Sequence, residues 1–151
     1  MNIKRIVAAG LVVDALSILI PLPSYTFFGW VFKLPPAEVW KWTPETSVGS
    51  MSIGWLAFVF LANTAFAIFL ALVYAVFHKA IAGNGFVRGL KFGLLIYPIA
   101  VLLPLFSVYV LLNVAGGALL YLALEGLLEF AVYGAALGMV YRDGGGTGGP
   151  A

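Results

Sequence analysis

Three acidic side chains, Asp14, Glu125 and Glu129, occur inside long stretches of sequence that are otherwise almost free of charge. A carboxyl group in apolar surroundings can hold a proton, bind a cation, or serve as a general acid and base. If their segment is helical, Glu125 and Glu129 lie one turn apart on one face, and Tyr121 and Tyr133 continue the same line. Two carboxyls this close in a low dielectric do not both ionise easily. The pair is therefore expected to hold a protonated acid, a shared proton, or a carboxylate with a bound cation.

No basic side chain is placed in the sequence to neutralise these acids. Lys, Arg and His are absent from residues 6–32 and from residues 92–141. Asn63, in another apolar stretch, falls at a depth comparable with Glu129, and a buried amide needs a hydrogen-bond partner. We therefore predict a small polar cavity that brings Asp14, Asn63 and the two glutamates together as a ligand or proton site. The alternative is that the acids are protonated, bond to tyrosines, serines or backbone carbonyls, and hold helices together.

These residues belong to four long apolar runs, at residues 3–22, 52–77, 86–112 and 115–141. A helix of about 20 apolar residues crosses a hydrocarbon core about 30 Å thick, and each run is near or above that length. The chain of 151 residues is 63% hydrophobic and 9% charged, whereas soluble domains are about 25% charged. The sequence therefore predicts an all-α membrane protein, a four-transmembrane-helix bundle that occupies residues 1–142 as a single domain.

The remaining segments are too short to build a core of their own. Residues 35–52 are the longest polar stretch, and the tail at 143–151 is glycine-rich and predicted to be disordered. All four tryptophans lie in or next to the first loop, which predicts an interfacial aromatic belt or, alternatively, a lid over a ligand. Pro35 and Pro36 favour the start of a short interfacial helix in this outer loop.

The distribution of basic residues predicts the orientation of the bundle. If all four runs cross, one side of the membrane receives six basic residues, whereas the other side receives only Lys33 and Lys41. Under the positive-inside rule, both termini and the second loop are then cytoplasmic. The six residues are Lys4, Arg5, Lys79, Arg88, Lys91 and Arg142.

Small residues recur at helical spacing and predict where the helices touch. In lipid, close approach through small side chains does much of the work of helix association. The faces expected to pack on protein carry Ala67, Ala71 and Ala75 in the second run, Gly89 and Gly93 in the third, and Gly134 and Gly138 in the fourth. Pro98 and Pro104 should bend or loosen the third helix.

The residue inventory excludes several classes of chemistry. The chain has no cysteine, so it can form no disulfide, thiolate metal site or thiol redox relay. His78 is the one histidine, too few for bis-histidine haem ligation, and we expect it to cap a helix end at the membrane interface. No nucleotide-binding or hydrolase motif occurs. We expect no catalytic residue, no metal, no cofactor and no nucleic-acid partner.

Three segments resemble those of known proteins. The opening MNIKRIVAAG, the segment GFVRGLKFGLL at 85–95 and the ending GMVYR at 138–142 are similar to those of small, uncharacterised prokaryotic membrane proteins with four predicted spans. The resemblance implies the cytoplasmic membrane of a bacterium or archaeon. No activity comes with it.

Three functions are compatible with this pattern. The first is a non-enzymatic membrane protein, either an accessory subunit of a partner membrane protein or a homo-oligomer that associates through its small-residue faces. The second is a small proton-linked or cation transporter that uses Asp14, Glu125 and Glu129. The third is an enzyme on a lipid-soluble substrate, which is disfavoured because no charged group is placed to bind a lipid phosphate within the membrane.

Overall fold

The computed structural model describes residues 2–21, 23, 53–111, 114 and 116–141, and every element in these residues is a helix. The predicted all-helical class is confirmed. The tryptophan-bearing loop, the short interfacial helix predicted within it and the glycine-rich tail lie outside the described residues. In chain order the elements are α1 (Ile3–Leu19), α3 (Ile53–Phe77), the 3-10 turn η4 (His78–Ala80), α4 (Gly85–Tyr97), the π-helical turn η5 (Pro98–Leu102), α5 (Leu103–Leu111) and α6 (Gly116–Val140).

Among the described residues, three helical segments are long and apolar enough to cross a membrane. They are Ile53–Ala80, Gly85–Leu111 and Gly116–Val140, with 28, 27 and 25 residues. Helix α1 has 17 residues and rises about 25 Å, which is less than the hydrocarbon thickness of about 30 Å. The structure therefore supports a membrane protein, and a fourth crossing by α1 stays a prediction.

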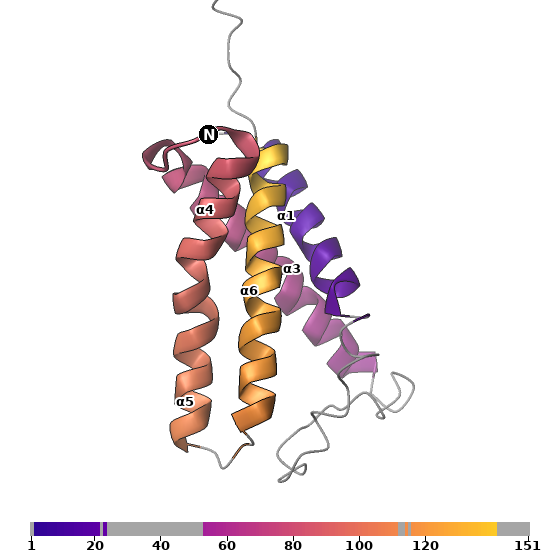
Figure 1. Cartoon of the computed structure of the whole chain (residues 1–151). Helices are drawn as coiled ribbons and strands as arrows, with labels where there is room; N and C mark the ends of the chain where they lie inside the picture. Colours follow the sequence, from indigo (N-terminus) through magenta and orange to yellow (C-terminus); the bar gives the residue numbers. More distant parts are fainter. Residues whose placement is uncertain (1, 22, 24–52, 112–113, 115, 142–151) are drawn as a thin grey trace, which may run out of the picture.

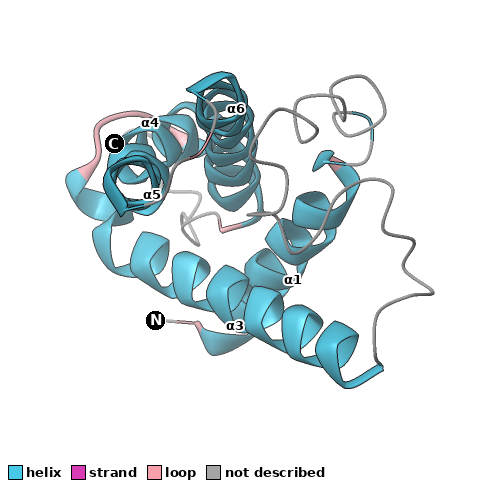
Figure 2. Ribbon diagram, turned by 90° about the horizontal axis from the view of Figure 1, so that it is seen from below, coloured by secondary structure: helices cyan, strands magenta, loops and turns pink. Residues whose placement is uncertain are grey.

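The helices form two layers. Helix α6 runs antiparallel to the continuous segment α4, η5 and α5, and α1 and α3 cross each other on another side of α6 (Figures 1 and 2). Helix α1 packs on both α3 and α6. The largest fully buried side chains are Val13, Tyr74, Phe92 and Leu137, one from each long helical segment. One shared core therefore joins all four segments.

This core occupies only one end of the bundle. Buried residues of α6 run mainly from Phe130 to Gly138, and those of α3 begin at Ala67. Helix α5 contains no buried residue at all. The bundle is thus tightly packed where α1 and α4 begin and α6 ends, whereas at its other end the described residues bury only a small cluster around Val114 and Ala118.

The tight end is built on direct backbone contact between α4 and α6. A Cβ atom added at Gly89 would overlap the Gly134 carbonyl oxygen, and one added at Gly93 would overlap the Phe130 carbonyl oxygen. A Cβ added at Gly138 would in turn overlap the Gly85 carbonyl oxygen. Only glycine permits two helices to approach this closely.

The predicted alanine face of α3 is buried as well. Ala67, Ala71 and Ala75 are nearly inaccessible to solvent. Next to them, Gly10 of α1 sits against Ile68, whose Cα would be 2.8 Å from a Cβ at that glycine. Small residues therefore set the approach of α1 to α3 in the same way.

Two prolines loosen the third apolar segment, as the sequence predicts. Because Pro98 has no N–H and the Pro104 ring would clash with the carbonyl four residues earlier, a regular α-helix is interrupted here. The chain responds with a π-helical turn, in which the Leu103 N–H donates to the Pro98 carbonyl five residues back. Beyond this turn α5 continues alongside α6 without burying any residue.

Candidate functional site

The structure separates the three acids of the apolar runs into two clusters. Asp14 faces α3, where it meets Asn63. Glu125 and Glu129 line a cavity whose other walls come from η5 and α5. The single polar cavity expected between the first, second and fourth apolar runs is therefore replaced by two polar sites on different helix pairs. Sequence spacing gives the face of one helix, but it does not give the rotation of that helix against its neighbours.

The Asp14 cluster is a network of hydrogen bonds between α1 and α3. The Asn63 Nδ2 donates to Asp14 Oδ1 over 2.5 Å and to Ser17 Oγ over 2.6 Å. The Thr64 hydroxyl donates to Asp14 Oδ2 over 2.8 Å. The Ser17 hydroxyl donates to the Asp14 carbonyl over 2.7 Å. Both carboxyl oxygens of Asp14 thus accept from α3, which attaches the two helices to each other.

Thr64 was missed by the sequence analysis, although a signal for it was present. It follows Asn63 directly in a run that is otherwise almost free of polar side chains. Neighbouring positions on a helix differ by about 100° in direction, so two adjacent polar residues can reach the two oxygens of one carboxyl group on a facing helix.

The glutamate cluster lies along one face of α6, as the four-residue spacing predicts. The Tyr121 hydroxyl donates to Glu125 Oε1 over 2.9 Å. The Tyr133 side chain is a hydrogen-bond partner of Glu129. Both glutamates are half-buried, whereas Tyr133 is only 4% exposed and packs against Phe130. Each carboxyl group therefore has a tyrosine partner one turn away on its own helix.

A cavity of about 300 Å³ borders this pair of carboxyl groups. Because α5 follows the π-helical turn without packing tightly on α6, space remains between them. The lining residues are Ala100, Val101, Pro104, Leu105, Leu122, Glu125, Gly126 and Glu129. On the α4 side, the Tyr97 hydroxyl donates to the Ala123 carbonyl over 2.9 Å and holds the two helices together.

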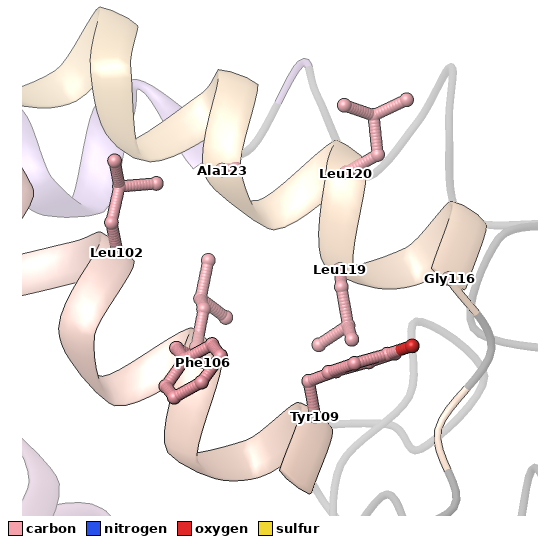
Figure 3. Close-up of a pocket in the computed structure, with 8 residues that line it drawn as sticks. Leu102, Phe106, Tyr109, Gly116, Leu119, Leu120 and Ala123 are labelled. Carbon is pink, nitrogen blue, oxygen red and sulfur yellow. The ribbon is translucent and has the colours of Figure 1, made fainter.

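A second cavity of about 340 Å³ lies between the same two helical segments. Leu105 lines both cavities. Figure 3 shows the second one, where Leu102, Phe106 and Tyr109 face the residues of α6 and the Leu119 side chain points toward the Tyr109 ring. The remaining lining residues are Gly116, Leu120 and Ala123. The two cavities differ in character: carboxyl groups line the first, whereas the second is lined by apolar side chains apart from the Tyr109 hydroxyl.

His78 lies at the end of α3, as expected of a capping residue, and it is buried against neighbouring helices, with 4% of its surface exposed. Its Nδ1 is 2.8 Å from the Ala75 carbonyl, and because a carbonyl only accepts, this nitrogen carries the hydrogen. The ring packs against Tyr74 and Tyr141, with centroids 5.8 Å and 5.2 Å away. Tyr74 also meets Phe92 edge-on at 5.1 Å. This aromatic cluster joins the ends of α3 and α6 to α4, and the sequence analysis missed it.

The described residues contain no group of three His, Cys, Asp or Glu side chains arranged to hold a metal ion. The two polar clusters consist of carboxyl groups, hydroxyls and one amide within apolar helices, which suits proton or cation binding and hydrogen bonding between helices. No protein-family model, no curated protein and no solved structure matches this chain. Its function therefore has to be inferred from its own residues.

Proposed function

We propose that this protein is a multi-pass integral membrane protein, without catalytic activity, that binds a proton or a cation at Glu125 and Glu129 inside the bilayer. One observation carries the proposal: two half-buried carboxyl groups line a cavity of about 300 Å³ in a helix that is able to span a membrane. A charged residue at the centre of a membrane helix costs about 2.5 to 3.5 kcal/mol on insertion scales. Such residues are retained where a proton, an ion or a partner compensates that cost.

The geometry favours a binding role for the glutamates over a purely structural one. Asp14 is bonded through both carboxyl oxygens to a neighbouring helix, which is what a structural link requires. Tyr121 and Tyr133 belong to the same helix as Glu125 and Glu129, so their bonds to these residues do not join two helices. The glutamates also border open space, which a ligand can enter.

The setting proposed for this function is the cytoplasmic membrane of a prokaryote, with four crossings and both termini in the cytoplasm. The described basic residues support that orientation, because they all belong to the start of α1, to η4 or to the start of α4. These three segments lie at the same end of the bundle (Figure 1). At this end Arg88 Nε donates to the Gly83 carbonyl and Lys91 Nζ donates to the Ala82 carbonyl. These cations stabilise the turn between η4 and α4 and keep their charge near water.

A second candidate function is an accessory or self-associating subunit. The absence of any buried residue in α5 favours it, since a partner helix placed there would cover the carboxyl groups. The small-residue faces, however, are already used within the chain, because Gly89 and Gly93 pack on α6 and the alanine face of α3 is buried. Association through those faces would require this packing to open.

The proposal is tested with Glu125→Gln and Glu129→Gln in the full-length protein, because glutamine keeps the shape and hydrogen bonding but cannot release a proton. Thermal stability in detergent is measured between about pH 5 and about pH 9, with and without sodium, potassium, magnesium and tetramethylammonium chlorides. We expect the wild type to respond to pH or to one of the cations, and a bound ligand at a hundred times its Kd to add about 2.7 kcal/mol of stability. Both variants should fold and lose the response.

The matched control is Asp14→Asn, which makes the same change of acid to amide at the structural cluster. It should lower stability but keep the pH or cation response. Identical responses of the wild type and both glutamine variants would refute the proposal.

A further inference from the structure

We propose that the end of the bundle where α4 begins holds an anionic phospholipid, with the phosphate of its headgroup at Lys79 and Lys91 and an acyl chain along the outward face of α4. This lipid site is separate from the glutamate cluster. Three features support it: the charge of this end of the bundle, the position of the two lysine side chains, and the apolar surface that continues from Lys91.

The end of the bundle where α1 and α4 begin carries only positive charge among the described residues. Its cations belong to the first turn of α1, to η4 and to the first two turns of α4 (Figure 1), and they are Lys4, Arg5, Lys79, Arg88 and Lys91. The described acid nearest to them in sequence, Asp14, comes nine residues after Arg5, which is about 13 Å along the helix. Arg142 and Asp143, which follow α6 in the sequence, cancel in formal charge. This end therefore attracts anions, and clusters of basic residues at helix ends are typical of contacts with anionic lipid headgroups.

Two lysine side chains meet at the turn between η4 and α4. Lys91 lies in the second turn of α4, but its long side chain runs back toward the start of the helix, where Nζ donates to the Ala82 carbonyl over 3.1 Å. An ammonium group has three N–H donors, so two of them remain for an anion. Lys79 is exposed and has no hydrogen-bond partner within the described part of the chain. Because the three residues from Lys79 to Ala82 span at most about 11 Å, both long side chains can reach one phosphate.

The turn itself is held in shape by its own hydrogen bonds. Arg88 Nε donates to the Gly83 carbonyl over 3.0 Å, and the Ile81 N–H donates to the His78 carbonyl over 3.3 Å. Gly83 has a φ of 126°, a backbone conformation that glycine adopts without strain. Arg88 also adds a positive charge three residues before Lys91, on the same side of α4. A site that is already ordered loses less conformational freedom when a ligand binds.

An apolar surface continues from Lys91 along the outward face of α4. Leu95 follows Lys91 by four residues, and Ile99 follows Leu95 by four, so the three side chains lie in one row that reaches the π-helical turn. Leu95 and Ile99 are 65% and 67% exposed. Gly89 and Gly93, on another face of the helix, pack against α6. The outward face therefore presents charge at the end of the bundle and hydrocarbon below it, which is the order of groups in a phospholipid.

This order of groups favours an anionic phospholipid over other ligands. A free phosphate, a nucleic acid or an acidic peptide would meet the positive charge but leave the exposed row of α4 without contacts. A zwitterionic phospholipid has the same acyl chains, but its headgroup carries a positive charge that the lysines repel. An anionic phospholipid complements both the charge and the apolar row.

The test measures lipid binding to the purified full chain in detergent by native mass spectrometry. The two ligands are phosphatidylglycerol and phosphatidylcholine with the same palmitoyl and oleoyl chains, so only the headgroup differs. We expect phosphatidylglycerol to bind at least about tenfold more tightly. The double variant Lys79→Gln with Lys91→Gln should lose at least about tenfold in affinity for phosphatidylglycerol.

A matched double variant separates a defined site from the general charge of this end. Lys4→Gln with Arg5→Gln removes the same charge from the same end of the bundle, but from α1, which packs on α3 and α6. It should lose less than about threefold in affinity for phosphatidylglycerol. Because Lys91 also bonds to the turn, Lys79→Gln is measured alone as well and should lose at least about threefold. Circular dichroism and size-exclusion chromatography check that every variant folds.

Inorganic phosphate and glycerophosphoglycerol, which is the headgroup without acyl chains, are added in excess as competitors, and neither should displace the lipid. Displacement by either one would show a site for a free anion and overturn the lipid site. Equal binding of the two phospholipids, unchanged binding in Lys79→Gln, or equal losses in the two double variants would overturn it as well. None of these outcomes bears on the pH or cation response of Glu125 and Glu129.

Discussion

At the scale of single residues, the Asn63 amide donates to two acceptors on α1, the Asp14 carboxyl group and the Ser17 hydroxyl. Both N–H groups of the amide therefore donate a hydrogen bond, and the Thr64 hydroxyl donates to the second carboxyl oxygen of Asp14. Glu125 and Glu129 differ, since their tyrosine partners are on their own helix. Carboxyl groups therefore serve two roles here: Asp14 links helices, and the glutamates form the proposed binding site.

Asn63→Ala should destabilise the protein because Asp14 and Ser17 then lose a donor that lipid cannot replace. We expect a loss of about 1 to 3 kcal/mol in the free energy of unfolding, the cost of leaving a buried polar group unsatisfied. The measurement is unfolding in mixed micelles of increasing sodium dodecyl sulfate content. Leu61→Ala, at a side chain 71% exposed on the same helix, is the control and should cost much less. Equal losses would show that the Asn63 bonds contribute nothing measurable.

At the scale of elements, the pair α4 and α6 depends on glycine at their line of contact. Gly138→Leu should therefore push the helices apart, because a side chain there would overlap the Gly85 carbonyl and the backbone of Gly89. We expect a loss of at least about 3 kcal/mol, or failure to fold in detergent. Gly54→Leu introduces the same side chain where an added Cβ meets no atom within 4 Å and should be tolerated. Fluorescence-detected size-exclusion chromatography compares the two, and equal tolerance would contradict the contact.

At the scale of the whole molecule, the helices place the basic residues of the described segments at one end. In this chain without cysteine, new cysteines at Asn84 and Ser47 therefore report the orientation. We expect an impermeant maleimide, added to intact cells, to label the cysteine at position 47 and to label the one at position 84 only after lysis, because the positive-inside rule puts the second loop in the cytoplasm. Labelling of both positions from the same side would refute the predicted topology.

The sequence predicted the helices well because each apolar run is long and its polar neighbours mark its ends. Pro98 and Pro104 also predicted the interruption that the π-helical turn provides. The partners of the polar residues were not predictable in the same way. Spacing places Glu125 and Glu129 on one face of α6, but the rotation and tilt of each helix decide whether that face meets α1 or α5. Those depend on the glycine contacts of all the helices together.

The glycine contact between α4 and α6 also has a genetic consequence. Gly89, Gly93, Gly134 and Gly138 lie where an added Cβ would overlap backbone atoms of the facing helix. Every codon for glycine begins with two guanines, and a change in either of them encodes a stop or a residue that carries a Cβ. No single-nucleotide change that alters one of these residues therefore preserves the contact. In a gene under selection for the folded protein, these four codons can vary only in their third base.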